Sequence, residues 1–172
     1  AKIPTMLANY NFKGGIPNKL GDPGIPTIPC SIKRNYVKTA LCDLGAGVSV
    51  MHFSLYHRLD LNKFTPTKIS LQMSNKSTAI PIGICEDVPV VVANVTILTD
   101  FVILDISEDD SMPIILGRPF LYTPGDVIDC NKCNVTFHVN GNEHTVHFTK
   151  KQPQVHSTNF YWKNFNYYYW SF

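Results

Sequence analysis

The chain has 172 residues, a formal net charge of +2 and 44% hydrophobic residues. This length suits one domain with an apolar core of its own. The small charge and the lack of a lysine and arginine cluster argue against nucleic-acid binding. Twelve prolines, ten glycines and many Val, Ile and Thr residues favour strands and turns over helices.

The sequence also bears on the compartment. It shows no signal peptide and no apolar run of about 18 residues, the length of a membrane span. Five cysteines without the spacing of a disulfide framework favour a reducing environment. We therefore expect an intracellular, cytoplasmic protein. The chain begins with Ala1 rather than Met, which suits a segment cut from a longer protein and weakens the argument from a missing targeting signal.

The first predicted elements form a hairpin that ends at an acidic residue. Residues 1–24, rich in Pro, Gly and Asn, are expected to form an extended lead-in. A strand is predicted over residues 24–32, a polar turn over 33–35, and a returning strand over 37–42. The second strand places Asp43 at its far end.

The next predicted elements are a strand over residues 48–51, a short helix within 54–61 and a projecting hairpin. The hairpin has strands over 69–73 and 79–84 around a polar tip. Strands over 88–92 and 95–98 then flank a tight turn at Ala93 and Asn94. The continuous apolar run 101–104 predicts a strand that is buried on both faces.

The remaining elements complete an all-β pattern. A strand over 114–116 precedes a short helix over 118–122, with Pro119 near its start. Strands over 127–129 and 135–139 form a further hairpin, and Asn140-Gly141 predicts a type I′ turn before a strand over 143–148. About ten strands and at most two short helices predict a closed or nearly closed all-β domain over residues 25–148.

Residues 149–172 form a separate, aromatic-rich tail. Nine of the thirteen residues from 160 to 172 are aromatic, without a helical or a two-residue period. Two interpretations stay open: a disordered end, or an aromatic strand that packs on its own domain or on a partner.

Two stretches carry the chemistry, residues 40–47 around Asp43 and residues 113–118. A carboxylate at the end of an apolar strand is costly unless it is hydrogen-bonded or used. The pair resembles the retropepsin family, the dimeric aspartic proteases of retroviruses and LTR retrotransposons. The string is most similar to plant LTR-retrotransposon polyprotein segments, in which Cys-Asp-Leu-Gly-Ala and Ile-Leu-Gly-Arg-Pro-Phe occur together. The resemblance covers residues 20–148.

The resemblance implies a retropepsin-like, closed barrel-like domain with a flap hairpin and one or two short helices. It implies that Asp43 is the catalytic acid, in a loop with Leu44, Gly45 and Ala46. It further implies a second apolar-Gly element, made of Ile115, Leu116, Gly117 and Arg118. The implied flap consists of Met73, Ser74, Asn75, Lys76, Ser77 and Thr78.

Aspartic proteolysis needs two carboxylates that share one proton and hold a water between them. The chain has one such loop, and no second Asp-x-Gly follows an apolar strand. We therefore expect a homodimer in which each copy supplies Asp43. The expected substrate is an extended peptide or polyprotein segment, with no cofactor, metal, nucleic acid or membrane as partner.

Leu44 departs from the family at the position of a Thr or Ser that donates hydrogen bonds across the dimer axis. Gly47 stands where the related plant sequences usually have Ser. Two hypotheses follow: an aspartic endopeptidase, weakened by Leu44, or a catalytically silent, retrotransposon-derived module for dimerisation or peptide binding. The plain structural interpretation of Asp43 is a turn residue that caps nearby N–H groups.

One further pattern combines cysteine and histidine residues. Cys130 and Cys133 form a CxxC pair followed by His138, His144 and His147, which makes a zinc site conceivable. The pair falls where a hairpin turn is predicted, so we expect no metal. Cys42 is expected to be a small core side chain rather than a nucleophile.

Overall fold

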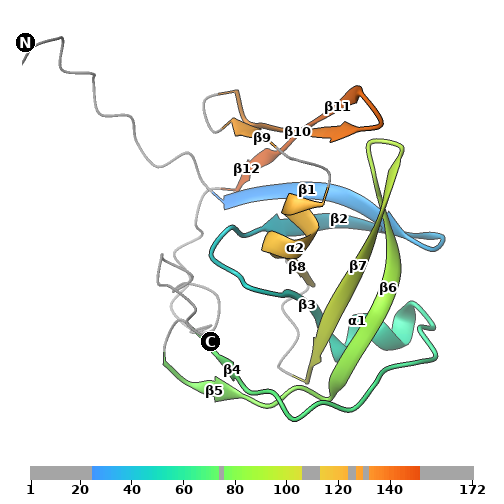
Figure 1. The fold of residues 1–172 in the computed structure, drawn as a ribbon, viewed down its shortest axis with the longest axis vertical. Coiled ribbons are helices and arrows are strands. Elements are labelled where there is room, and N and C mark those ends of the chain that lie inside the picture. The colour runs from blue at the N-terminus through green and yellow to red at the C-terminus, as the bar shows by residue number, and fades with distance from the viewer. Residues whose placement is uncertain (1–24, 74–75, 106–112, 124–126, 130–131, 152–172) are drawn as a thin grey trace, which may run out of the picture.

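The structure, a computed structural model, describes residues 25–73, 76–105, 113–123, 127–129 and 132–151. Over these residues it has twelve strands and two short helices (Figure 1). In chain order the elements are β1 (Ile25–Ile32), β2 (Asn35–Cys42), β3 (Ser49–His52), α1 (Phe53–Arg58), β4 (Leu71–Gln72), β5 (Thr78–Ala79), β6 (Gly83–Val92), β7 (Val95–Leu104), β8 (Ile114–Leu116), α2 (Arg118–Tyr122), β9 (Val127–Asp129), β10 (Asn134–Val139), β11 (Asn142–His147) and β12 (Thr149–Lys151).

Six of the strands form a closed barrel. They are paired in the order β1-β2-β8-β3-β7-β6, and β6 returns to β1 through the pairs Ser31–Val91 and Ile32–Val90. The closed all-β fold with two short helices is therefore confirmed. Outside this ring, β12 pairs antiparallel with the start of β1, so the sheet extends beyond residue 148.

Two parallel pairings lie within the barrel, β2 with β8 and β3 with β7. All residues of β3 and β8 are buried, as are the last four residues of β7. Strands that are covered on both faces need continuous apolar runs, which is why they lack alternation. The predicted burial of residues 101–104 is confirmed.

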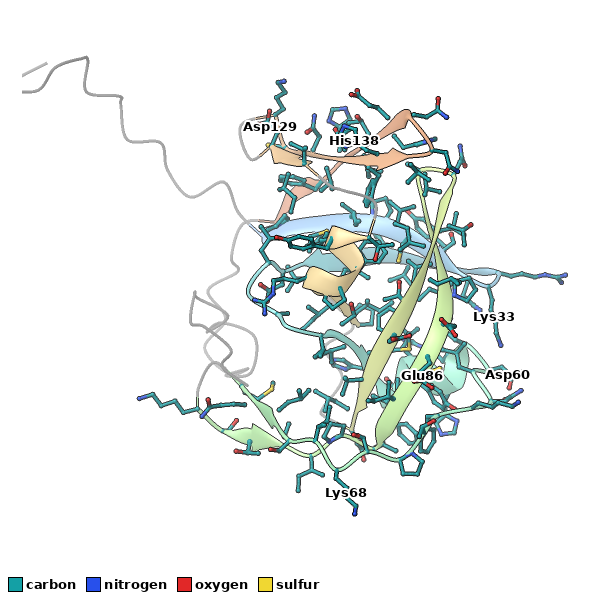
Figure 2. The ribbon with its side chains drawn as sticks, viewed as in Figure 1. Lys33, Asp60, Lys68, Glu86, Asp129 and His138 are labelled. Atoms are coloured by element: carbon teal, nitrogen blue, oxygen red, sulfur yellow. The ribbon has the colours of Figure 1, made fainter. Side chains whose placement is uncertain are left out.

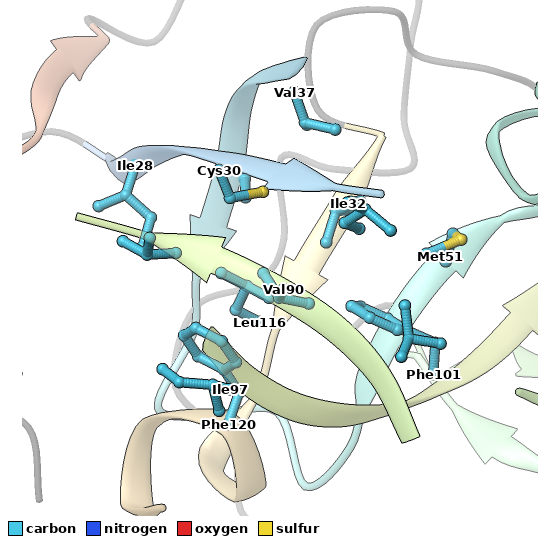
Figure 3. Close-up of a cluster of buried hydrophobic side chains, with 14 of the residues drawn as sticks. Ile28, Cys30, Ile32, Val37, Met51, Val90, Ile97, Phe101, Leu116 and Phe120 are labelled. Carbon is cyan, nitrogen blue, oxygen red and sulfur yellow. The ribbon is translucent and has the colours of Figure 1, made fainter. Parts of the chain in front are cut away.

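The main core fills the barrel. Ile28, Met51, Phe101 and Leu116 come from four different strands and are fully buried in one cluster (Figure 3). Phe120 of α2 joins the same cluster and meets Phe137 of β10 edge to face, with ring centroids 6.2 Å apart. This contact fastens the separate β9-β10-β11 sheet to the barrel.

Two tight turns follow the predicted chemistry. Ala93 and Asn94 between β6 and β7 have φ values of 48° and 67°, and Asn140 and Gly141 between β10 and β11 have 52° and 78°. Positive φ at both central residues is the mark of a type I′ turn, which suits the twist of paired strands.

The projecting hairpin and the first helix are shorter than predicted. The pairing expected between residues 69–73 and 79–84 is limited to β4 and β5, because Ile80 is 79% exposed and Pro81 has no N–H for a ladder. Gly83 and Ile84 belong to β6 instead. The helix expected within 54–61 ends at Arg58, and Asp60 has a left-handed φ of 49°. Neither α1 nor α2, the helices of the described ranges, has the length or apolarity to cross a membrane.

Candidate active site

Asp43 lies immediately after β2, beside the end of β8. The last residues of the two parallel strands, Cys42 and Leu116, are register partners. The Asp43 N–H donates to the Leu116 carbonyl at 3.0 Å. Parallel strands end at one edge of a sheet, so the two stretches singled out in the sequence meet there.

The Asp43 carboxyl has one occupied and one unoccupied oxygen. Its Oδ1 accepts the Gly45 N–H at 2.7 Å, while Oδ2 is buried without a hydrogen-bond partner. Burial raises the pKa of the Asp43 carboxyl above its usual value of 3.8. The N–H groups of Gly45 and Ala46 and the charge of Arg118 act in the opposite direction but do not outweigh desolvation. The group therefore keeps its proton to higher pH than an exposed aspartate.

Gly117 and Arg118 hold the far side of the loop. The Arg118 N–H donates to the Ala46 carbonyl at 2.9 Å, and its Nη1 donates to the Leu44 carbonyl at 3.4 Å. A Cβ on Gly117 would lie 2.4 Å from the carbonyl oxygen of Val48, so the backbones meet too closely for any side chain. The Asp43 loop is thus fixed by contacts within one chain.

Leu44 presents its side chain to solvent. It is 56% exposed, in contrast to Ala46, which is 4% exposed and packs inward. Gly45 between them leaves room for the carboxylate, since a Cβ there would lie 3.0 Å from Asp43 Oδ1. The loop therefore has an apolar outer tip and a tightly packed inner half.

The predicted flap is only partly described. Ser74 and Asn75 lie outside the described residues. At the tip, the Met73 N–H donates to the Ser77 carbonyl and the Lys76 N–H to the Met73 carbonyl, both at 2.8 Å. Thr78 begins β5. Two backbone hydrogen bonds therefore close the described part of the tip.

The hairpin base shares a small apolar cluster with the Asp43 loop. Leu71 of β4 and Ala79 of β5 pack in the same cluster as Ala46, Val48 and Ile115. This cluster is separate from the main core. The hairpin and the loop are thus parts of one packed unit.

The described residues of the conceivable zinc site do not form a metal-binding group. Cys130 lies outside the described residues. His138 lies on the β9-β10-β11 sheet (Figure 2). Its Nε2 is 3.4 Å from Oε1 of Glu143. His144 pairs with the buried Phe137, which puts it on the other face from His138. In the described ranges, no group of three or more His, Cys, Asp or Glu side chains has metal-binding geometry.

Two contributions were not found by sequence reasoning. Ser49 was seen only as part of a strand, yet its hydroxyl is buried and accepts the Gly117 N–H at 3.0 Å. The sequence pattern placed Arg118 in a motif but predicted no partner for its side chain. In the structure, the guanidinium donates to the Leu44 carbonyl. The available signal for Ser49 was a hydroxyl inside a run of apolar residues.

Comparison with known proteins identifies the fold. No model of a known protein family matches the chain, and no curated protein matches it in sequence. Among solved structures, the chain is similar to the crystal structure of the retroviral protease-like domain of Ddi1 from Leishmania major. The TM-score is 0.57 at 21% identity, over 76% of this chain and 95% of that chain. Together with the Asp43 loop on paired parallel strands, this likeness shows that the chain has a retropepsin-like fold.

Proposed function

We propose that the chain is an aspartic endopeptidase of retropepsin type that acts as a homodimer. The observation that supports this most is the Asp43 carboxyl: it sits at a strand end with one buried oxygen free of hydrogen bonds. A buried acid without a full set of partners is costly to keep unless it has a use. The retropepsin-like fold supports proteolysis as that use.

A dimer would complete the site. Within the described residues, the one charged side chain that acts on Asp43 is Arg118, so no second carboxylate of the same chain pairs with it there. A second copy would bring its own Asp43. One carboxylate then acts as a base on water while the other, protonated, donates to the scissile carbonyl oxygen. The raised pKa of Asp43 favours the protonated member of the pair.

The proposed substrate is an extended peptide within a polyprotein. It would bind as a strand beneath the tip of the β4–β5 hairpin, whose base packs with the Asp43 loop in one apolar cluster. The proposed origin is a plant LTR-retrotransposon polyprotein. Its support is the string from Cys42 to Ala46 together with that from Ile115 to Phe120.

The test is cleavage of a peptide library between pH 4 and 7 by the full chain. We expect cleavage that pepstatin inhibits and that Asp43→Asn abolishes. Asp60→Asn is the matched control, because Asp60 is exposed and Asn tolerates its positive φ. Absence of cleavage, or equal cleavage by Asp43→Asn and the unaltered chain, contradicts the proposal.

Leu44 supports a second candidate, a silent module that dimerises or binds peptides without cutting them. Its exposed side chain has no hydroxyl to donate a hydrogen bond. The double variant Leu44→Thr with Gly47→Ser separates the two candidates. Activity that appears only in this variant identifies a silenced protease, whereas activity of the unaltered chain excludes the silent module.

A further inference from the structure

Ser49 is a buried hydroxyl at the start of an apolar strand. It is 1% exposed, and β3 continues with Val50 and Met51, which are also buried. Its Oγ accepts the Gly117 N–H at 3.0 Å, across 68 positions of the sequence. A buried hydroxyl is tolerated where it is hydrogen-bonded, and this one bonds to the element that follows β8.

The bond fixes the residue that precedes Arg118. Gly117 is pressed against the Val48 carbonyl and, as the N-cap residue of α2, has no side chain of its own to cap the helix. The Arg118 N–H bonds to the Ala46 carbonyl at 2.9 Å, and its guanidinium reaches the Leu44 carbonyl. Ser49 therefore anchors the backbone from which the Arg118 side chain extends along the Asp43 loop.

The surroundings of Asp43 leave few other charges to consider. Among the described residues, Arg118 is the one charged side chain that acts on the carboxyl. β8 and the paired part of β7 are apolar, the β4–β5 hairpin contributes Leu71 and Ala79, and β2 contributes Cys42. His52, the titratable residue of β3, lies at the end of that strand opposite to Ser49.

We infer that Ser49 is a positioning residue for Asp43: by holding Gly117 it places the Arg118 guanidinium on the Asp43 loop. This inference deepens the proposed function and rests on it. The role of the hydroxyl is to accept a hydrogen bond, and no bond to Asp43 or to substrate is involved. Without it the Gly117–Arg118 turn is free to shift, and the charge that opposes the effect of burial moves away from the carboxyl.

The first test is a titration of the Asp43 carboxyl by carbon-detected NMR in the full chain. Ser49→Ala is expected to raise the pKa of Asp43, because it weakens the opposing effect of Arg118. Ser49→Thr restores the hydroxyl and is expected to return the pKa to that of the unaltered chain. The acidic limb of the pH profile of kcat is expected to shift upward in Ser49→Ala and back in Ser49→Thr.

A matched control separates positioning from loss of stability. Thr99 is another buried hydroxyl of the barrel, 3% exposed and bonded to the Ile97 carbonyl at 3.2 Å. Thr99→Val is expected to change the free energy of unfolding but not the titration of Asp43. Arg118→Gln is expected to raise the pKa as Ser49→Ala does, and the two changes together are expected to add little to either alone.

Each outcome of these tests either supports or overturns the positioning role of Ser49. An unchanged titration in Ser49→Ala, an equal shift in Thr99→Val, or additive shifts with Arg118→Gln overturns the inference, even if the chain cuts peptides. The expected shifts in a chain that cuts nothing support the positioning and overturn the proposed function alone. Should Ser49→Ala fail to fold, Ser49→Cys takes its place, since its weakly accepting thiol is close in size.

Discussion

At the scale of single residues, burial of the Asp43 carboxyl is unfavourable, while the hydrogen bonds of its loop are favourable. Asp43 loses hydration on burial, and it recovers only part of that loss through the Gly45 N–H and the charge of Arg118. Such a residue lowers the stability of the fold that carries it, as site residues often do. The balance has measurable consequences for pH dependence and for packing.

Replacing Asp43 is expected to stabilise the chain in a pH-dependent way. The folded-state pKa lies above the usual 3.8, so the folded state binds more protons than the unfolded state between the two values. Stability of the unaltered chain therefore falls as pH rises through this window and stays lower above it. In Asp43→Asn the amide oxygen of Asn can still accept the Gly45 N–H, and the charge is lost. Urea unfolding in dilute solution at pH 3 to 7 should show a gain for Asp43→Asn that grows with pH, and Asp60→Asn should show no such growth.

A side chain at Gly117 is expected to destabilise the Asp43 loop. The added Cβ of Gly117→Ala would lie 2.4 Å from the Val48 oxygen and 2.6 Å from its carbon, both backbone atoms that cannot move aside alone. Overpacking of this kind costs about 1–3 kcal/mol, measurable by urea unfolding. Gly141→Asn is the control: its Cβ would meet nothing within 4 Å, and Asn tolerates the positive φ. Equal losses in the two variants would contradict this account.

At the scale of elements, the β4–β5 hairpin depends on one side chain more than on its ladder. Its strands have two residues each, which is too little pairing to be stable alone. Leu71 is 7% exposed and packs with the cluster that includes Ala46. Packing against the Asp43 loop therefore supplies the stability that pairing lacks.

Shortening Leu71 is expected to release the hairpin while the barrel stays intact. Leu71→Ala removes apolar contacts worth about 2 kcal/mol or more at a buried site. Hydrogen exchange followed by mass spectrometry should show faster exchange at Met73, whose N–H bonds to the Ser77 carbonyl, and unchanged exchange in β6 and β7. Gln72→Ala, at an exposed neighbouring position, should leave both unchanged. Barrel-wide acceleration in Leu71→Ala would show that the hairpin is not an independent unit.

At the scale of the whole molecule, closure of the barrel depends on a short junction between β1 and β6. Two register pairs join these strands, and Ile32 and Val90 at the junction are fully buried. By contrast, the β6–β7 ladder extends over eight pairs. Together with the β3–β8 pairing, which also has two register pairs, this junction is among the shortest pairings of the ring, so side-chain packing matters there.

Truncating Ile32 is expected to weaken the entire fold. Loss of a fully buried Ile costs about 2–5 kcal/mol, and exchange at Val90 and Val91 should accelerate before exchange elsewhere in β6. The measurement is urea unfolding combined with hydrogen exchange. Tyr36→Ala on the neighbouring strand is the control, because Tyr36 is 70% exposed. A small loss in Ile32→Ala would mean that the ring does not rely on this junction.

Local patterns predicted the elements whose cause is local. The type I′ turn at Asn140 and Gly141 and the non-alternating strand of residues 101–104 both follow from chemistry within a few residues. β12 escaped prediction, because Thr149–Lys151 is a strand only through its pairing with β1. The hairpin of β4 and β5 was predicted but with strands that are too long, since Ile80 and Pro81 end the pairing that the alternation of residues 69–73 suggested.

The candidate site, too, could be predicted only in part from the sequence. Asp43 and the Gly117-Arg118 element could be named from their sequence pattern, and the retropepsin-like fold places them side by side. The partnership of Ser49 with Gly117 could not, since nothing within a strand of four residues indicates that its hydroxyl will meet a residue 68 positions later. Long-range polar contacts depend on the tertiary fold and cannot be predicted from local periodicity.

That long separation has a consequence for the order in which the protein is made. Asp43 emerges from the ribosome long before Leu116, Gly117 and Arg118, the residues that hold its loop. Contacts so distant along the chain form late, after the intervening strands have found their places. The Asp43 carboxyl of a nascent chain therefore lacks the contacts that hold its loop until residues 116–118 have been made and the barrel has closed.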